Sequence, residues 1–203
     1  MPALTQSSVA IKIAGGAVFS AISVVLSILF SPIVPRVPGW GIALIDPVSI
    51  IWVLCFLIFG VLAGLLCSTV GFIALFYVDP FVPWGPIFKL LATLPLIIIP
   101  YLLLKVRFHS EDSCISLGCG FKKPSTYVMA AIPAIIVRCV VMGLVNILFF
   151  IYILGEGAII AVGGLQTIVI VAVAINAEQS IWDLSIPWLI TYPTGIYQLH
   201  KLW

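Results

Sequence analysis

The sequence predicts an all-α integral membrane protein, built as one bundle of six transmembrane helices with both termini in the cytoplasm. Of its 203 residues 63% are hydrophobic and only 8% are charged, whereas soluble domains carry about 25% charged residues. Apolar runs of about 18 residues or more recur along the chain, and such a run can span the hydrocarbon core of a bilayer as a helix. They are longer than the segments of about ten residues that cross a membrane as β-strands, so helices are the expected spanning elements.

Six spans are expected from the apolar runs, which are broken by charged residues, proline and glycine. The runs cover residues 11–31, 47–60, 61–78, 86–105, 126–154 and 172–199. Phe59 and Gly60 mark a tight turn between the second and third runs, because glycine allows a reversal that needs positive φ. Residues 1–203 then form one transmembrane domain with a cytoplasmic loop at 106–125. The stretch 157–175 is open to three interpretations: a re-entrant or surface helix, the start of a long last span, or a seventh crossing.

Lysine and arginine residues set the orientation, because they gather in cytoplasmic segments. With six spans and the N-terminus inside, the cytoplasmic segments carry Lys12, Lys105, Arg107, Lys122, Lys123 and Lys201. The opposite side carries Arg36 and, near its surface, Lys89. We therefore expect a multi-pass protein of the plasma membrane with both termini in the cytoplasm.

Several function classes are disfavoured by what the sequence lacks. It contains no G-x-x-x-x-G-K-[ST] phosphate loop, so work driven by ATP needs a partner protein. The basic residues are too scattered to form a nucleic-acid surface. His109 and His200 have no carboxylates at metal-ligand spacing within a span, and Cys114 and Cys119 are most simply reduced loop thiols. We expect no metal, no cofactor and no catalytic residues.

Charged residues at membrane depth are costly and face the protein interior or a cavity. At 1.5 Å per helical residue, Arg138 lies about 18 Å from the inner end of its span, and Asp183 and Lys89 lie about 24 Å from theirs. The three are expected to share one layer. The simplest interpretation is a structural ion pair between Arg138 and Asp183, since opposite buried charges offset each other's desolvation.

Polar side chains form a second layer, about 30 to 35 Å from the inner ends of the last two spans. Its members are Asn146, Asn176, Glu178 and Gln179. Arg138, Met142, Asn146 and Phe149 or Phe150 follow one another at helical spacing and mark one inward stripe. An amide, a thioether and nearby aromatic rings suit a flat heteroaromatic ligand better than an ion. The alternative is that the amides only hydrogen-bond neighbouring helices.

Small residues line one side of the first span. Ala10, Ala14, Ala17 and Ala21 include two A-x-x-x-A pairs, a spacing at which another helix can approach closely. This stripe either packs inside the bundle or receives a helix of another protein.

Together these features resemble the substrate-binding S component of energy-coupling factor (ECF) vitamin transporters, and the riboflavin branch is the most similar. The resemblance rests on the following motifs: Ala17-x-x-x-Ala21, Ile58-Phe59-Gly60-Val61-Leu62-Ala63-Gly64, Gly85-Pro86-Ile87-Phe88-Lys89-Leu90-Leu91-Ala92-Thr93, Val137-Arg138-Cys139-Val140-Val141-Met142-x-x-x-Asn146, and Asn176 near the start of the last helix. Where the riboflavin branch typically has a lysine three residues after that asparagine, this sequence has Gln179.

The resemblance implies a six-helix bundle that binds a vitamin, here most similar to riboflavin, at the extracellular side, near the loop after the first span. It also implies that the alanine motif of Ala17 and Ala21 docks on a transmembrane T component driven by two cytoplasmic ATPases, while the S component itself catalyses nothing. The expected ligand contacts are Asn146, Asn176, Gln179, Trp40, Trp84, Met142 and Lys89.

Two other classes compete with this interpretation. A membrane-embedded enzyme acting on a lipid or isoprenoid would use Lys89, Arg138, Glu178 and Asp183 as its polar set, but these residues are not clustered in the sequence as such sites usually are. A stand-alone permease would be supported by two similar halves, and the chain shows no convincing internal repeat.

Overall fold

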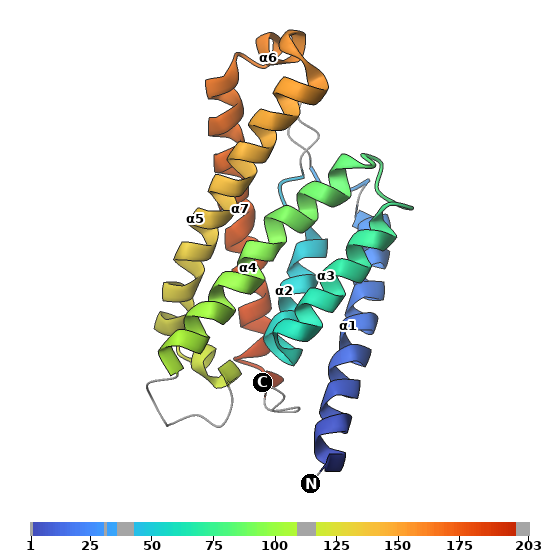
Figure 1. Ribbon diagram of the computed structural model, residues 1–203, viewed down its shortest axis with the longest axis vertical. Coiled ribbons are helices and arrows are strands. Elements are labelled where there is room, and N and C mark those ends of the chain that lie inside the picture. The colour runs from blue at the N-terminus through green and yellow to red at the C-terminus, as the bar shows by residue number, and fades with distance from the viewer. Residues whose placement is uncertain (1, 31, 36–42, 109–116, 198–203) are drawn as a thin grey trace.

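The computed structural model describes residues 2–30, 32–35, 43–108 and 117–197, and every regular element in these ranges is helical. The elements are α1 (Pro2–Phe30), α2 (Pro47–Phe59), α3 (Val61–Leu75), α4 (Trp84–Phe108), η1 (Leu117–Lys122), α5 (Pro124–Phe149), η2 (Phe150–Leu154), α6 (Glu156–Ala161) and α7 (Leu165–Thr191). Figure 1 shows the long helices running side by side, so that α1 begins and α7 ends at the same end of the bundle. We call this the lower end, and the opposite one the upper end.

The expected membrane character is confirmed by four helical stretches among the described residues, each long and apolar enough to cross a bilayer. They are Val9–Phe30, Trp84–Val106, Pro124–Leu154 and Leu165–Thr191. The helices α2 and α3, expected as full spans, have only 13 and 15 residues, or about 20 and 22 Å. Eleven residues of α2 are buried by the protein itself, because α1, α3 and α7 all pack around it.

The turn between α2 and α3 lies where the sequence predicts it. Gly60 ends one helix and begins the next with φ of 93°, a conformation that residues with a Cβ rarely adopt. One turn later, a Cβ on Gly64 would lie 2.7 Å from Cβ of Phe56. Glycine at 64 is therefore what allows the two short helices to touch along their length.

The inward face of α1 consists of small residues, but not the alanines. Gly16, Ser20, Ser23 and Ser27 are buried, and Trp52 of α2 donates its indole N–H to Ser23 Oγ at 3.0 Å. The alanine stripe lies on the other side of the helix, where Ala14, Ala17 and Ala21 are exposed. The alanine stripe therefore does not pack inside the bundle.

The stretch 157–175 is neither a seventh crossing nor a re-entrant segment. The six-residue helix α6 is about 9 Å long, and it joins α5 to α7 at the upper end (Figure 1). Gly163 and Gly164 both have positive φ and interrupt the helical conformation. The helix α7 then begins at Leu165 rather than near 172. Of the alternatives, a short surface helix followed by the start of a long last helix agrees with the structure.

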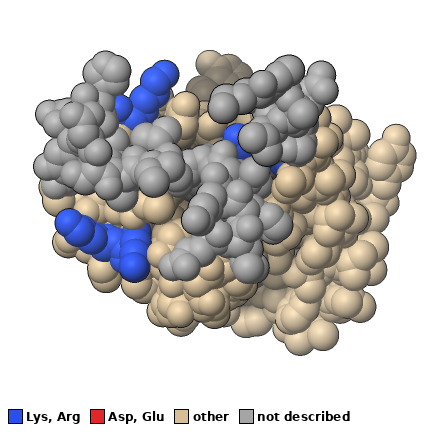
Figure 2. All heavy atoms as spheres, turned by 90° about the horizontal axis from the view of Figure 1, so that it is seen from below, with Lys and Arg blue, Asp and Glu red and all other residues tan. Residues whose placement is uncertain are grey.

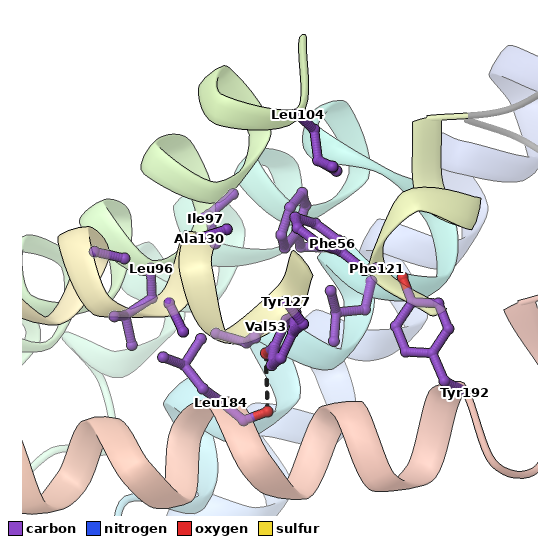
Figure 3. Packing of buried hydrophobic residues seen from close by; sticks show 13 residues of the cluster. Val53, Phe56, Leu96, Ile97, Leu104, Phe121, Tyr127, Ala130, Leu184 and Tyr192 are labelled. Atoms are coloured by element: carbon purple, nitrogen blue, oxygen red, sulfur yellow. Dashed lines mark hydrogen bonds between the residues drawn. The ribbon is translucent and has the colours of Figure 1, made fainter. Parts of the chain in front are cut away.

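A hydrophobic cluster fills the lower half of the bundle (Figure 3). It brings together Phe56, Phe121, Tyr127 and Tyr192, and the hydroxyl of Tyr127 donates to the carbonyl of Leu184 at 2.9 Å. The hydroxyl of Tyr192, just past α7, donates to the carbonyl of Gly118 at 3.0 Å, and burial raises the pKa of this tyrosine. The short helix η1 is thereby held under the bundle and covers its lower end.

Candidate functional site

A cavity of about 240 Å³ opens in the upper half of the bundle. Its volume is many times the ~15 Å³ that a single water molecule needs. The first turns of α4 and the second half of α5 form two of its walls, and the middle of α7 forms a third. The segment before α2 and the turn after α3 contribute Ala43, Asp46 and Asp79. Five separate parts of the chain thus meet at one site.

Arg138 of α5 connects the polar side of this cavity to α7. Its Nη1 lies 2.5 Å from Oδ2 of Asp183, its Nη2 donates to Oε1 of Gln179 at 2.7 Å, and its Nε donates to Oδ1 of Asn176 at 3.1 Å. The Arg138 side chain is 2% exposed. Ser49 of α2 donates to the remaining oxygen of Asp183 at 2.8 Å. The expected ion pair of Arg138 and Asp183 is therefore confirmed, and it forms the centre of a larger network.

The two amides of α7 belong to this network rather than to a separate layer. Gln179 donates its side-chain N–H to the carbonyl of Ala43, and Asn176 donates to the carbonyl of Ala172 at 2.8 Å. Because α7 begins at Leu165, Asn176 lies near the middle of this helix and not near its start. Both amides line the cavity, but each already uses its oxygen to hold Arg138.

Lys89 lines the same cavity as Arg138 but has acidic partners of its own. Its Nζ lies 3.4 Å from Oδ1 of Asp46 and 3.9 Å from Oδ2 of Asp79. Asp46 also caps the start of α2 by accepting from the N–H of Val48, while Asp79 accepts from the N–H of Phe81. Lys89 therefore ties together the two chain segments that border the upper part of the cavity.

Asn146 has the polar group that is freest to bind a ligand. The residue is only 3% exposed and lines the cavity together with Met142, one helical turn below. Its Nδ2 donates to the carbonyl of Met142 at 2.8 Å. Among the described residues none donates a hydrogen bond to its Oδ1, so this acceptor remains available inside the cavity.

A cluster of aromatic rings also lines the cavity. Trp84 and Phe88 of α4 each meet Phe149 of α5 edge to face, with 5.2 Å between ring centroids. Phe150, the first residue of the π-helical turn η2, extends the cluster. Wider turns of this kind are frequent at functional sites, because the extra residue redirects the side chains around it.

Six of the seven expected ligand contacts line the cavity. They are Lys89, Trp84, Met142, Asn146, Asn176 and Gln179. Trp40 falls outside the described residues. Phe149 and Phe150, of which one was expected on the inward stripe of the fifth span, line the cavity as well. The sequence did not indicate that Asp46, Asp79 and Phe88 would join them. Asp-Pro pairs at 46–47 and 79–80 signal a helix cap and a turn, but not which lysine those carboxylates meet.

The chain shows no significant match to any protein-family model, to any curated protein or to any solved structure. Evidence for its function is therefore confined to its own residues and geometry.

Proposed function

We propose that the chain binds a small, flat, uncharged solute in the upper cavity. The observation that supports this most directly is that one cavity is lined both by an aromatic cluster, formed by Trp84, Phe88 and Phe149, and by the amides Asn146, Asn176 and Gln179. Aromatic rings bind planar ligands across their faces or edges, and a few fixed polar groups orient them.

Charge supports an uncharged ligand over an anion. The Arg138 guanidinium is balanced by Asp183, and Lys89 lies between two carboxylates, Asp46 and Asp79. No cation among the described lining residues is left without an acidic partner. A phosphorylated solute would therefore meet no free positive charge and would lie near an excess carboxylate.

The proposal includes a topology in which the chain crosses the membrane six times and both termini lie in the cytoplasm. The helices alternate in direction, and α2 and α3 serve as short crossings covered by their neighbours (Figure 1). Lys105, Lys122 and Lys123 lie at the lower end, and Figure 2 shows basic but no acidic side chains on the described part of that end. Since such residues favour the cytoplasm, the cavity opens to the outside.

The function that fits this arrangement is that of an ECF-type S component in the plasma membrane, with riboflavin as the proposed solute. The motifs that resemble this family support the assignment, and the exposed stripe of Ala17 and Ala21 leaves a surface for the T component. Turnover then depends on that partner and on two cytoplasmic ATPases. An enzyme is less well supported, because Glu178 and Asp183 are not among the residues that line the cavity.

Co-purification tests the assignment directly. The detergent-purified protein should show flavin absorbance in the near-ultraviolet and blue, and mass spectrometry of the released small molecule should give the mass of riboflavin. A different planar, uncharged compound would keep the binding function and discard riboflavin. A protein that carries no solute, and whose tryptophan fluorescence is not quenched by added vitamins, would contradict both.

Asn146 offers the cleanest test of the site, because its side chain bonds only to its own helix. Asn146→Leu removes the free acceptor and should weaken riboflavin binding by about 1 to 3 kcal/mol, or roughly 5- to 150-fold. Thr69→Val is the matched control, since Thr69 is exposed and hydrogen-bonds only within its own helix, α3. Equal affinities in both variants would place the ligand elsewhere.

A further inference from the structure

A second, smaller cavity adjoins the upper one on the side of α1. Its volume is about 30 Å³, which is enough for about two water molecules. Four residues line both cavities, namely Ala43, Asp46, Asp79 and Lys89. The ion cluster that Lys89 forms with Asp46 and Asp79 therefore lies between the two cavities, and a solute that extends past it from the upper cavity would enter the smaller one.

The smaller cavity has room only for a narrow group. Its other walls include Ser27 and Phe30, in the last turn of α1, and Val48, at the start of α2. An aromatic ring needs several times its volume, since benzene binds in a cavity of about 150 Å³. A planar solute thus fits the upper cavity with its ring, and only a thin chain attached to that ring fits beyond the ion cluster.

The ion cluster offers hydrogen-bond acceptors and donors side by side. A carboxylate can accept about four hydrogen bonds, and an ammonium group can donate three. Among the described residues, Asp46 Oδ1 accepts from the N–H of Val48 at 3.1 Å and lies 3.4 Å from Lys89 Nζ. Asp79 Oδ1 accepts from the N–H of Phe81 at 2.8 Å. The described residues therefore use only part of the hydrogen-bonding capacity of this cluster.

Hydroxyl groups are the uncharged groups that suit such a cluster best. Each hydroxyl can donate to a carboxylate and accept from an ammonium group, whereas a charged group would be attracted by one sign and repelled by the other. Hydrogen bonds to ionised partners are also about twice as strong as those between neutral groups. A chain with several hydroxyls can therefore follow the cluster of Lys89, Asp46 and Asp79 from one cavity to the next.

The buried amide of Asn146 indicates independently that the upper cavity takes a ligand with a polar group. This residue is 3% exposed and lines the upper cavity, and no described residue donates to its Oδ1. It belongs to α5, whereas Asp46 precedes α2 and Asp79 follows α3. A ligand that meets both Asn146 and the ion cluster must carry polar groups at two different places.

We propose that the cluster of Lys89, Asp46 and Asp79 binds a short hydroxylated chain, so that the solute class is a planar ring that carries a polyol. This rests on the proposed binding of a flat, uncharged solute in the upper cavity. The ring lies against the aromatic cluster of that cavity, and the chain passes the two carboxylates and ends in the smaller cavity. The ion cluster thereby distinguishes a ring with such a chain from the same ring without it.

Two flavins that share one ring system test the chain site. Riboflavin carries a polyol on the ring, lumiflavin carries a methyl group at the same position, and both are uncharged. Quenching of flavin fluorescence by the purified protein should give an affinity about tenfold or more higher for riboflavin, because hydrogen bonds to ionised groups are lost with the chain. Equal affinities would overturn the chain site and leave ring binding intact. If neither flavin binds, the proposed ligand fails and the chain site fails with it.

Substitutions locate the chain. Asp79→Asn keeps an acceptor for the N–H of Phe81 and leaves Asp46 to balance Lys89. It should lower the affinity for riboflavin by about fivefold, since an ionised acceptor becomes neutral, and leave the affinity for lumiflavin unchanged. Asp46→Asn should repeat this result, because asparagine also caps a helix.

Phe88→Leu is the matched control. Phe88 precedes Lys89 on α4 and, of the two cavities, lines only the upper one. This substitution should weaken the binding of both flavins by the same factor, because it affects the ring alone. Retained lumiflavin binding in the two aspartate variants shows that they are folded. An equal loss of both flavins in those variants, or an unchanged affinity for riboflavin, would overturn the proposal.

Discussion

Arg138 and Asp183 form an ion pair between the middle of α5 and the lower half of α7, with 2.5 Å between Nη1 and Oδ2. Both side chains are almost completely buried. The same guanidinium also holds Asn176 and Gln179, and Gln179 in turn holds the carbonyl of Ala43. One cation therefore fixes α5, α7 and the segment before α2 relative to one another at the base of the cavity.

Removing the Arg138 cation alone should lower the stability of the protein far more than removing both Arg138 and Asp183. Arg138→Met leaves Asp183 as an unpaired buried charge and should lower the free energy of unfolding by about 3–5 kcal/mol. The double variant Arg138→Met/Asp183→Leu should recover most of that loss, because neither charge then remains in the interior. Denaturation in detergent, followed by tryptophan fluorescence, measures both. The single variant Asp183→Leu completes the comparison. If the loss of the double variant equals the sum of the losses of Arg138→Met and Asp183→Leu, the two charges do not interact.

Gly64 should not tolerate even a methyl group. In Gly64→Ala the new Cβ would lie 2.7 Å from Cβ and 3.0 Å from Cα of Phe56, so the backbones of α2 and α3 must separate. We expect a loss of about 1–3 kcal/mol in the free energy of unfolding. Gly157→Ala in α6 is the control, since a Cβ there meets nothing within 4 Å. If both substitutions are neutral, the close approach of α2 and α3 is not required.

Trp84 should contribute to solute affinity through its ring. Trp84→Leu removes the edge-to-face contact with Phe149 and part of the aromatic cluster, and it should weaken binding by about 0.5–1.5 kcal/mol. Phe76→Leu provides the comparison, because Phe76 is 36% exposed and is not among the cavity-lining residues. Tryptophan quenching or calorimetry gives the affinities. If the two substitutions have equal effects on affinity, the solute does not bind against the aromatic cluster.

Docking through α1 can be separated from binding. Ala17→Trp or Ala21→Trp enlarges an exposed small residue on the surface proposed for the T component, so uptake should stop while the purified protein keeps its solute affinity. Ile136→Trp, on the exposed face of α5, should leave uptake intact. Uptake of radiolabelled solute by whole cells provides the measurement. Full uptake by both α1 variants would exclude this face from docking.

Features encoded by local residue types could be predicted from the sequence. The turn at Gly60 follows from one glycine between two apolar runs, and the pairing of Arg138 with Asp183 follows from counting helical residues to a common depth. The inward stripe of Arg138, Met142 and Asn146 follows from helical periodicity, and all three residues line the cavity. In each case the determining information lies within one helix or in the position of two residues along their helices.

Features set by contacts between distant segments could not be predicted. Lys89 was placed correctly along α4, but its partners Asp46 and Asp79 come from the ends of other helices, and helix rotation decides which side chains meet. The start of α7 stayed open, because residues 165–171 are mostly apolar and could belong either to a loop helix or to the last span. Only the positive φ of Gly163 and Gly164 identifies the break.

The short central helix α2 bears on how the chain enters the membrane. A helix of 13 residues, about 20 Å long, is too short to remain stably inserted alone across a hydrocarbon layer of about 30 Å. We expect α2 and α3 to leave the translocation machinery as one helical hairpin and to be shielded first by α1. The upper cavity then exists only after α7, which follows the other described helices in the chain, has packed over α2 and brought Asp183 to Ser49.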